Sequence, residues 1–276
     1  MLSRVWPMPL MRWAEPVRAG GRLAAQYRQL VGPRAMAWAF RCVPVCSSTE
    51  SLLRRWLVES PRFEQPRAVL AGHQIRAYGQ RGRVWSAPKG GVWVSAALPW
   101  SSRPPAQAGL LGLAVALAMA ERLEQHDLPV RIKWPNDLLV DGFKLAGLLP
   151  RLVHRGSELR TVRLGFGLNV SNVVPVGATS IQRLLGRGHG GVEYWAAQFL
   201  LALDQCMGRA ADRNWCLRGA SERLWSDRVR DPADGQVWMI DGLDGDGALL
   251  VRHGSHTARW LRWSSPGECV LESGAS

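Results

Sequence analysis

The sequence lacks the cysteine patterns of a disulfide framework or a zinc site. Its five cysteines show no paired zinc spacing, and an odd number in a chain of 276 residues favours reduced thiols. Cys42 and Cys46 form a CxxxC pattern, a weak signal that we interpret as core packing. The six histidines are scattered, and no Ser, His and Asp set has the spacing of a nucleophilic triad. We therefore predict neither a metal site held by the protein nor a triad hydrolase.

A long hydrophobic run is also missing. The longest, at residues 108–120, is too short to span a bilayer and predicts a buried helix instead. The N-terminus alternates Trp, Met, Pro and Arg, and it has no apolar core before a small-residue cleavage site. We expect a cytoplasmic protein with no membrane role.

The chain contains no block of like charges, although it is strongly basic. Lys and Arg exceed Asp and Glu by 35 to 22, which gives a net charge of +13. The positive residues are mostly Arg and are spread along the chain, which argues against a dedicated nucleic-acid tail. The excess charge suits nucleic acid, anionic substrates or an acidic protein partner.

Hydrophobic patterning predicts strands and helices over most of the chain. A hydrophobic fraction of 47% is ample for a packed core. A capping-box pattern at residues 47–50 predicts a helix start, Pro104 and Pro105 open a long apolar helix, and residues 191–226 carry helical spacing. Predicted strands lie at residues 37–45, 68–74, 92–98, 130–134 and 162–170, with a hairpin turn at Asp141-Gly142 between residues 138–140 and 143–149.

The hydrophobic pattern of the sequence changes near residue 230. Three short alternating runs, separated by Asp-Gly and His-Gly turns, predict a small antiparallel meander or barrel. We predict an irregular N-terminal extension at 1–36 (loose or a short helix), a main domain at 37–229 and a small β domain at 230–272.

Two segments carry most of the chemical signal. Backbone amides near Gly79, Gly82 and Gly90 could approach an anion, and Arg81 and Arg83 add guanidinium forks suited to phosphate. An exposed hairpin loop with solvated arginines would also explain this stretch. In the second segment, Lys133 ends an apolar strand, where its ammonium would stabilise a developing negative charge. An ordinary surface lysine at a strand terminus is the alternative.

Other polar residues have two explanations each. Ser48 and Thr49, at a predicted helix start, could bind a polar head group or simply cap the helix. Gln74 could hydrogen-bond an amide or ureido group, or face solvent. Gly147 and the glycines of residues 165–169 suggest a close approach of backbone to another group.

Taken together, these segments resemble one family, the biotin protein ligases. Residues 48–50 resemble its Ser-Thr-Asn signature, and residues 74–88 resemble its Gly- and Arg-rich loop. Residues 133–137 match its Lys-Trp-Pro-Asn-Asp segment, the most specific part, and residues 144–147 match Lys-Leu-Ala-Gly. The Gly-x-Gly-x-Asn strand at 165–169 and the turn-rich tail complete a resemblance that covers residues from about 43 to 265.

The resemblance implies a mixed sheet backed by helices (α/β, α+β) and a C-terminal SH3-like barrel. It implies a two-step enzyme that uses ATP and Mg²⁺, makes biotinyl-5′-AMP and biotinylates a lysine of the biotin carboxyl carrier protein of acetyl-CoA carboxylase. Lys133 and Arg83 would be catalytic. Biotin would contact Ser48, Thr49, Glu50, Gln74, Gly79, Gln80, Arg81, Lys133 and Gly147, and the adenylate would contact Arg81, Arg83, Trp85, Lys133, Asn136 and Asn169, with residues 176–185 ordering over adenine.

The chain also departs from the family pattern. Residues 77–80 read Ala-Tyr-Gly-Gln where members usually have Gly-Arg-Gly-Arg, so two loop cations are absent. We expect looser retention of the adenylate, measurable as biotinyl-AMP released without an acceptor. Glu50 replaces Asn, Ala87 replaces Ser, and Arg151 stands where an acidic residue is common.

Two alternatives stay open. One is a lipoate ligase or octanoyltransferase, which shares the general fold. The other, from a different class, is a basic nucleic-acid-binding module without catalysis. Some family members carry an N-terminal DNA-binding domain, but residues 1–40 are too short and irregular for one, so we expect no repressor role. We expect a monomer or a homodimer.

Overall fold

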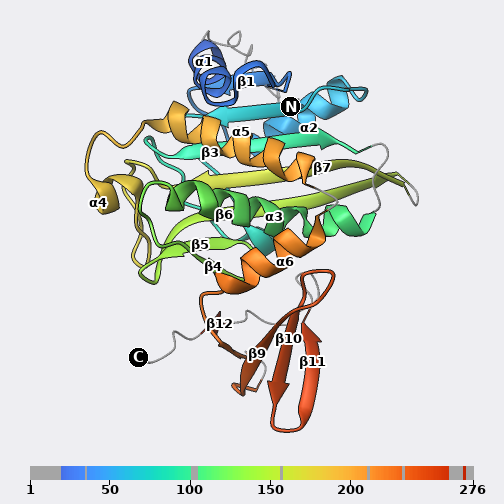
Figure 1. Ribbon diagram of the computed structural model, residues 1–276. Helices are drawn as coiled ribbons and strands as arrows, with labels where there is room; N and C mark the ends of the chain where they lie inside the picture. Colours follow the sequence, from blue (N-terminus) through green and yellow to red (C-terminus); the bar gives the residue numbers. More distant parts are fainter. Residues whose placement is uncertain are drawn as a thin grey trace, which may run out of the picture.

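The computed structural model describes residues 20–34, 36–100, 105–155, 158–209, 212–231, 234–260 and 270–271. The described chain forms two sheets, a seven-stranded one in the order β1-β2-β3-β7-β6-β5-β4 and a five-stranded one in the order β11-β10-β9-β8-β12. In Figure 1 the smaller sheet lies below the β4 edge of the larger one. This arrangement confirms the predicted mixed sheet, and the small antiparallel sheet is consistent with an SH3-like domain.

The large sheet is antiparallel except where β1 and β2 run parallel. The tight turn before β6 has Asp141 at φ 50° and Gly142 at φ 80°, the left-handed pair that a two-residue hairpin needs, so the predicted hairpin is confirmed. The strands are β1 (Ala39–Val43), β2 (Arg67–Ala71), β3 (Val92–Pro99), β4 (Arg131–Lys133), β5 (Asp137–Val140), β6 (Phe143–Arg155) and β7 (Glu158–Leu168).

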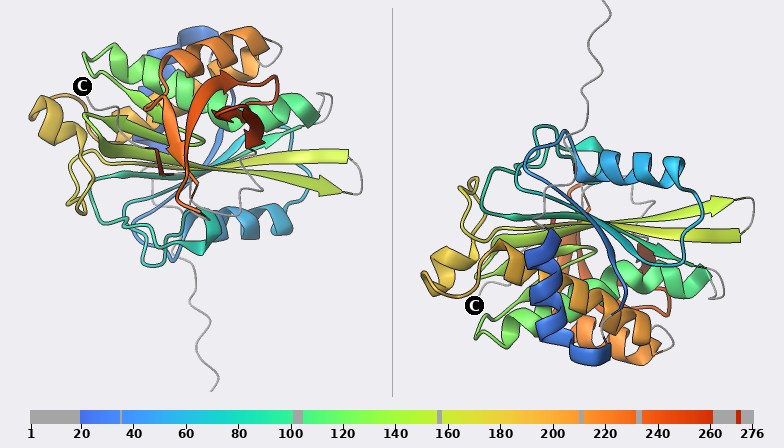
Figure 2. Two further views of the ribbon diagram at one scale, coloured as in Figure 1. Left: turned by 90° about the horizontal axis from the view of Figure 1, so that it is seen from below. Right: turned by 90° about the horizontal axis from the view of Figure 1, so that it is seen from above.

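Helices cover both faces of this sheet, as Figure 2 shows. One face carries α1 (Gly20–Val31), α3 (Pro105–Glu124), α5 (Val192–Gly208) and α6 (Arg213–Glu222), and the opposite face carries α2 (Thr49–Glu59). The short α4 (Ile181–Leu185) and two 3-10 turns, η1 (Gly32–Arg34) and η2 (Gln80–Gly82), complete the helical segments. Helix α3 is buried as its apolar sequence predicts, because Leu113, Val115 and Leu117 are fully inaccessible.

Helix α1 belongs to the main core. Its Leu23 and Tyr27 are each only 2% exposed, and the Tyr27 hydroxyl donates a hydrogen bond to Asp204 on α5. Trp38 donates to the same carboxylate over 3.2 Å. Of the two expectations for this region, the short helix is therefore right from residue 20 onward, while residues 1–19 lie outside the described part.

The C-terminal sheet is the predicted meander with additional strands. It contains β8 (Arg228–Arg230), β9 (Val237–Leu243), β10 (Leu249–His253), β11 (His256–Trp260) and β12 (Val270–Leu271). The predicted boundary near residue 229 falls inside β8, which pairs with β9. The predicted residue limits of the main domain (37–229) and of the small β domain (230–272) therefore stay a prediction.

Candidate functional site

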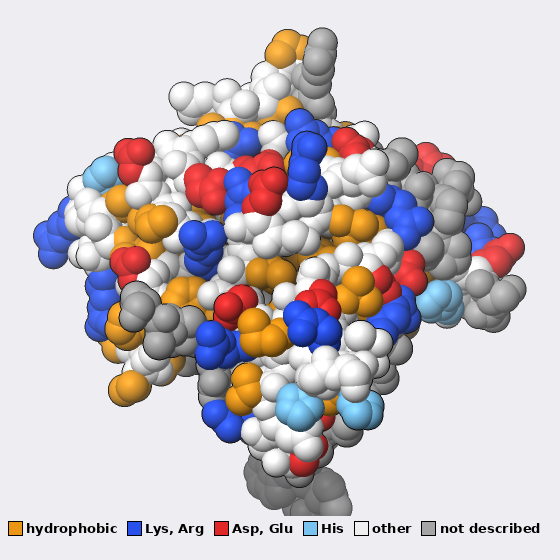
Figure 3. All heavy atoms as spheres, turned by 60° about the horizontal axis from the view of Figure 1, so that its bottom comes forward, with side chains coloured by type: hydrophobic (Ala, Val, Ile, Leu, Met, Phe, Trp, Pro, Cys, Tyr) orange, Lys and Arg blue, Asp and Glu red, His pale blue; other side chains and the backbone are white. Residues whose placement is uncertain are grey.

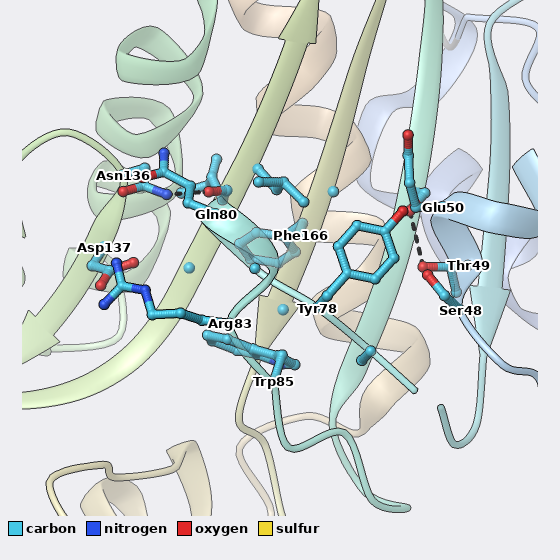
Figure 4. Close-up of a pocket in the computed structure, with 18 of the residues that line it drawn as sticks. Ser48, Thr49, Glu50, Tyr78, Gln80, Arg83, Trp85, Asn136, Asp137 and Phe166 are labelled. Atoms are coloured by element: carbon cyan, nitrogen blue, oxygen red, sulfur yellow. Dashed lines mark hydrogen bonds between the residues drawn. The ribbon is translucent and has the colours of Figure 1, made fainter. Parts of the chain in front are cut away.

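A cavity of about 400 Å³ lies on the α2 side of the large sheet. Figure 4 shows side chains from α2, from the loop before β3 and from the β4–β5 turn pointing into it. Four separate segments of the predicted site therefore meet here. Of the predicted residues, the lining includes Ser48, Thr49, Glu50, Gln74, Gly79, Gln80, Arg83, Trp85, Lys133, Asn136 and Gly147.

Glycines on the central strands form the floor of this cavity. Gly147 on β6 is directly opposite Gly167 on β7, and the ring of Trp85 lies over both. A Cβ at Gly167 would come within 2.7 Å of that ring, and one at Gly147 within 3.2 Å. The close approach expected at these glycines is thus made by Trp85 itself.

The start of α2 is organised by Gln74 rather than by a capping box. Ser48 is the N-cap residue, but its side chain makes no capping hydrogen bond, so the predicted capping box is wrong. Instead the Gln74 Oε1 atom accepts from the Thr49 amide over 2.7 Å and from the Thr49 hydroxyl over 3.1 Å. Since a backbone N–H requires an acceptor, the amide orientation of Gln74 is determined and its NH₂ group faces elsewhere.

Thr49 extends this network to the floor strand β3. Its hydroxyl lies 2.9 Å from that of Ser95, which is 1% exposed. Ser95 lines the cavity, although our sequence reasoning did not select it. The signal was present, because Ser95 is the one polar residue of the strand Val92–Pro99. Hydroxyl and amide groups held in this way are preorganised to bind a compact polar head group.

Glu50 is buried at the same end of the cavity. It is 5% exposed and forms an ion pair with Arg163 of β7 at 3.0 Å. Burial raises the pKa of the Glu50 carboxyl, and the nearby guanidinium of Arg163 offsets this only in part. Glu50 is thus paired with Arg163 within the protein, and its predicted contact with biotin stays a prediction.

Two further departures from the family pattern contact each other beside this pair. Arg151 on β6 is the register partner of Arg163, and its guanidinium lies 5.9 Å from the centre of the Tyr78 ring. Tyr78 belongs to the loop over the cavity. A cation–π contact thus joins this loop to the sheet at the position where the family usually has a loop arginine.

The loop before β3 forms a narrow hairpin around η2. The Gly79 amide donates to the Arg83 carbonyl over 2.8 Å, and the Trp85 amide donates to the Ala77 carbonyl over 3.0 Å. Figure 4 shows the Arg83 side chain reaching toward Asp137. Nothing is described for the side chain of Arg81, so its predicted contacts remain untested.

Lys133 lies at the other side of the cavity, at the end of β4, and is partly exposed. The turn that follows it is fastened to β6, since the Asn136 side-chain amide donates to the Leu148 carbonyl and the Leu148 amide returns a hydrogen bond of 2.9 Å to Asn136. Next to this turn, Asp137 and Lys144 pair at 2.6 Å, and the Lys144 ammonium lies 4.7 Å from the Trp85 ring centre.

Asn169 is the one predicted adenylate residue with a described side chain that does not line the cavity. It is 4% exposed, its side-chain oxygen accepts from Asn172 over 3.0 Å, and its backbone oxygen accepts from Ile181 over 3.1 Å. In the structure it anchors the segment between β7 and α4, and its expected place near the nucleotide stays a prediction.

Two carboxylates, those of Glu50 and Asp137, are among the groups that line the cavity. In the described ranges, no three His, Cys, Asp or Glu side chains gather in a group that could hold a metal ion. None of the helices in those ranges is long and apolar enough to cross a membrane. The cavity lining has the hydroxyl and amide groups of Ser48, Thr49 and Gln74 in one part and the ammonium of Lys133 in another.

Comparison with known proteins identifies the family of this chain. The Biotin/lipoate A/B protein ligase family matches residues 43–169. The chain is 30% identical over 230 residues to Biotin--[acetyl-CoA-carboxylase] ligase of Paracoccus denitrificans, covering 74% of this chain and 91% of that protein. It is 29% identical over 230 residues to the chloroplastic Biotin--protein ligase 1 of Arabidopsis thaliana, covering 71% of this chain and 62% of that protein.

Solved structures show the same fold. The biotin protein ligase of Aquifex aeolicus, solved in complex with biotin and ATP, matches with a TM-score of 0.66 at 20% identity, covering 85% of this chain and 98% of that one. The architecture is thus that of the biotin protein ligases. The chain belongs to the biotin/lipoate A/B protein ligase family and is similar to its biotin protein ligases. It spans less than two thirds of the plant relative.

Proposed function

We propose that this protein is an ATP-dependent biotin ligase. The observation that carries the proposal is the single cavity that has the Ser48, Thr49 and Gln74 groups at one end and Lys133 at the other. A cyclic urea needs several hydrogen-bond partners in a fixed arrangement, and a mixed carboxylate–phosphate group needs positive charge. The cavity offers both within about 400 Å³, a volume typical of a small-molecule site.

The first step joins biotin to AMP. A carboxylate oxygen of biotin attacks the α-phosphorus of ATP, a P–O bond forms, and the bond to the departing pyrophosphate breaks. Lys133 would neutralise the carboxylate and the α-phosphate as charge builds there, and Arg83 would hold the phosphate from the loop. No side-chain nucleophile is required, because positioning and charge stabilisation drive such displacements.

Magnesium would enter with ATP. Mg²⁺ commonly binds substrate phosphates and water with only one or two carboxylates from the protein. Asp137 lines the cavity and is the carboxylate that fits this role, once its contact with Lys144 is exchanged. When bound, the ion would neutralise phosphate charge.

The second step transfers biotin to a protein. The amine of an acceptor lysine attacks the acyl carbon of biotinyl-AMP, the C–O bond to AMP breaks, and the amine loses a proton as the amide forms. We propose that the acceptor is the biotin carboxyl carrier protein of acetyl-CoA carboxylase. The name of the Paracoccus denitrificans relative supports this choice. We also propose a cytoplasmic location, which suits the free thiols of the four described cysteines.

A lipoate ligase or octanoyltransferase is the alternative within the same fold. A cysteine-dependent transferase has little support, because no cysteine is among the residues that line the described cavity. Burial also raises the pKa of Cys42 and Cys46 to about 11, which keeps both thiols protonated near neutral pH.

The proposal is tested by exchange of labelled pyrophosphate into ATP with biotin or lipoate as the acid. We expect biotin-dependent exchange in the wild type and a loss of about 10²- to 10³-fold in kcat for Lys133→Ala, the range for removing one group that stabilises transition-state charge. Lys89→Ala is the matched control, since Lys89 is exposed and does not line the cavity. Exchange supported by lipoate instead of biotin would contradict the proposal.

A further inference from the structure

The tryptophan that follows Lys133 packs into the C-terminal sheet. Trp134 is 5% exposed, and its buried neighbours are Val229, Leu249 and Val251. Lys133 and Trp134 are consecutive residues, so their Cα atoms lie about 3.8 Å apart. The proposed catalytic lysine is therefore one peptide bond away from a side chain that is held by the other sheet.

A hydrogen bond fixes the position of the Trp134 ring. Its Nε1 atom donates to the Gly247 carbonyl over 2.9 Å, and this contact is buried. Gly247 belongs to the tight turn between β9 and β10, where the Asp244 carboxylate accepts from the amides of Asp246 and Ala248 over 2.8 and 2.9 Å. The Gly247 amide also donates to the Asp244 carbonyl over 2.9 Å. The carbonyl that receives Trp134 is thus presented by a well-ordered turn.

This turn is fastened to the main domain at a second point. Arg213, on α6, donates to the Gly245 carbonyl, and its guanidinium lies 3.5 Å from the Asp246 carboxylate. The turn is consequently held between α6 and the residue next to Lys133.

The outer edge of β4 is also tied to the segment that leads into the small sheet. The Ile132 amide donates to the Arg223 carbonyl over 2.6 Å, and the Trp225 amide donates to the Ile132 carbonyl over 2.9 Å. As the last strand of its sheet, β4 has β5 on one side and this segment on the other. The two neighbours of Lys133 in the chain, Ile132 and Trp134, are therefore both placed against residues that belong to or precede the C-terminal sheet.

We infer that Trp134 is a positioning residue, through which the C-terminal sheet sets the place of Lys133 in the cavity. The inference rests on the proposed function. Removing the indole N–H would leave the Gly247 carbonyl without this partner and let the ring shift within its cluster. A displacement of about 1 Å in a reacting group costs on the order of 10²-fold in rate, so a small shift at Trp134 should be visible in catalysis.

Trp134→Phe tests this inference, with Trp238→Phe as the matched control. Trp238 packs against the same cluster, and within the described residues its buried Nε1 atom has no hydrogen-bond partner. Both substitutions remove an indole N–H from one cluster, but only the first loses a hydrogen bond beside Lys133. The measurements are kcat and the KM for biotin in biotin-dependent pyrophosphate exchange, together with Tm.

We expect kcat of Trp134→Phe to fall by about ten- to a hundredfold, with the KM for biotin and the kcat of Trp238→Phe each within about twofold of wild type, at temperatures well below both Tm values. Equal kcat values for the two variants would overturn the inference while leaving the proposed function intact. A wild type without biotin-dependent exchange would overturn both.

If Trp134→Phe does not fold, Arg213→Ala replaces it. Its side chain is 44% exposed, so the substitution should be tolerated. It loosens the same turn from α6, and we expect a smaller loss, about threefold or more, again in kcat rather than in the KM for biotin. An unchanged kcat for Arg213→Ala would then overturn the inference.

Discussion

At the scale of single residues, the cavity has polar groups that are already engaged with one another. Thr49, Gln74 and Ser95 form one hydrogen-bonded network, and Glu50 pairs with Arg163. Such contacts lock rotamers before a ligand arrives, which lowers the entropy lost on binding. The head-group end of the site is therefore rigid.

The Glu50–Arg163 pair predicts a pH-dependent effect on stability. Burial raises the pKa of Glu50, so the folded state holds this proton more tightly than the unfolded state does. The folded protein thus loses stability as pH rises from the ordinary glutamate pKa of about 4.3 through the raised value. Glu50→Gln has no such titration, so its Tm relative to wild type should shift upward between pH 4 and pH 7.

The measurement is thermal unfolding of both proteins across that pH range. Glu59→Gln is the control, because Glu59 is an exposed residue of the same helix. A difference in Tm between Glu50→Gln and wild type that stays constant with pH would contradict the prediction.

At the scale of elements, strands β6 and β7 need glycine where Trp85 lies across them. An alanine at Gly167 would place its Cβ within 2.7 Å of the Trp85 ring. We expect Gly167→Ala to lose about 1 to 3 kcal/mol of stability through overpacking and to raise the KM for ATP as Trp85 and its loop move.

Gly208→Ala serves as the control for this substitution, since a Cβ there meets nothing within 4 Å. Urea unfolding and pyrophosphate exchange measure the two effects. If Gly167→Ala behaves like Gly208→Ala in both assays, the position of the Trp85 ring does not depend on a glycine at residue 167.

Local patterns were sufficient to predict most elements of the large sheet. Strand β3 is buried almost throughout and α3 is buried over residues 113–120, and the Asp141-Gly142 turn has its own conformational signature. Features that depend on distant residues could not be predicted. Helix α1 is held by Tyr27 and Asp204, which are 177 positions apart, and α2 is capped by Gln74 instead of its own serine.

The same distinction between local patterns and distant contacts holds for the candidate site. Most of the residues that motif spacing selected do line the cavity, because each of their segments is continuous in the sequence. Spacing says nothing of contacts between segments, and so it missed Ser95 and the contact of Trp134 with Gly247. It also gave no sign that the Asn169 side chain accepts a hydrogen bond from Asn172, and the expected place of Asn169 near the nucleotide stays a prediction.

At the scale of the whole molecule, the net charge of +13 needs an explanation. The face seen in Figure 3 carries Lys and Arg interspersed with Asp and Glu, and no continuous positive surface is visible there. A protein with a positive net charge still attracts an acidic protein over a distance. We interpret the charge as steering an acidic carrier domain rather than as binding nucleic acid.

The steering hypothesis predicts a salt dependence of carrier association. Between about 50 and 500 mM NaCl, the association rate constant measured by stopped-flow should fall by about tenfold or more, because screening shortens the reach of the charge. The dissociation rate constant should change less. Association that is equally fast at both salt concentrations would rule out steering, and tight salt-dependent binding to DNA or RNA would support the nucleic-acid alternative.

In the proposed function, one cavity joins biotin to AMP and then transfers the biotinyl group to a lysine. Its most direct test is the intact mass of a biotin carboxyl carrier domain after incubation with this protein, ATP, magnesium and equal concentrations of biotin and lipoate. We expect the mass increase of one biotinyl group, which requires ATP and is lost when the acceptor lysine is replaced by arginine. A lipoyl adduct, or an unmodified carrier, would contradict it.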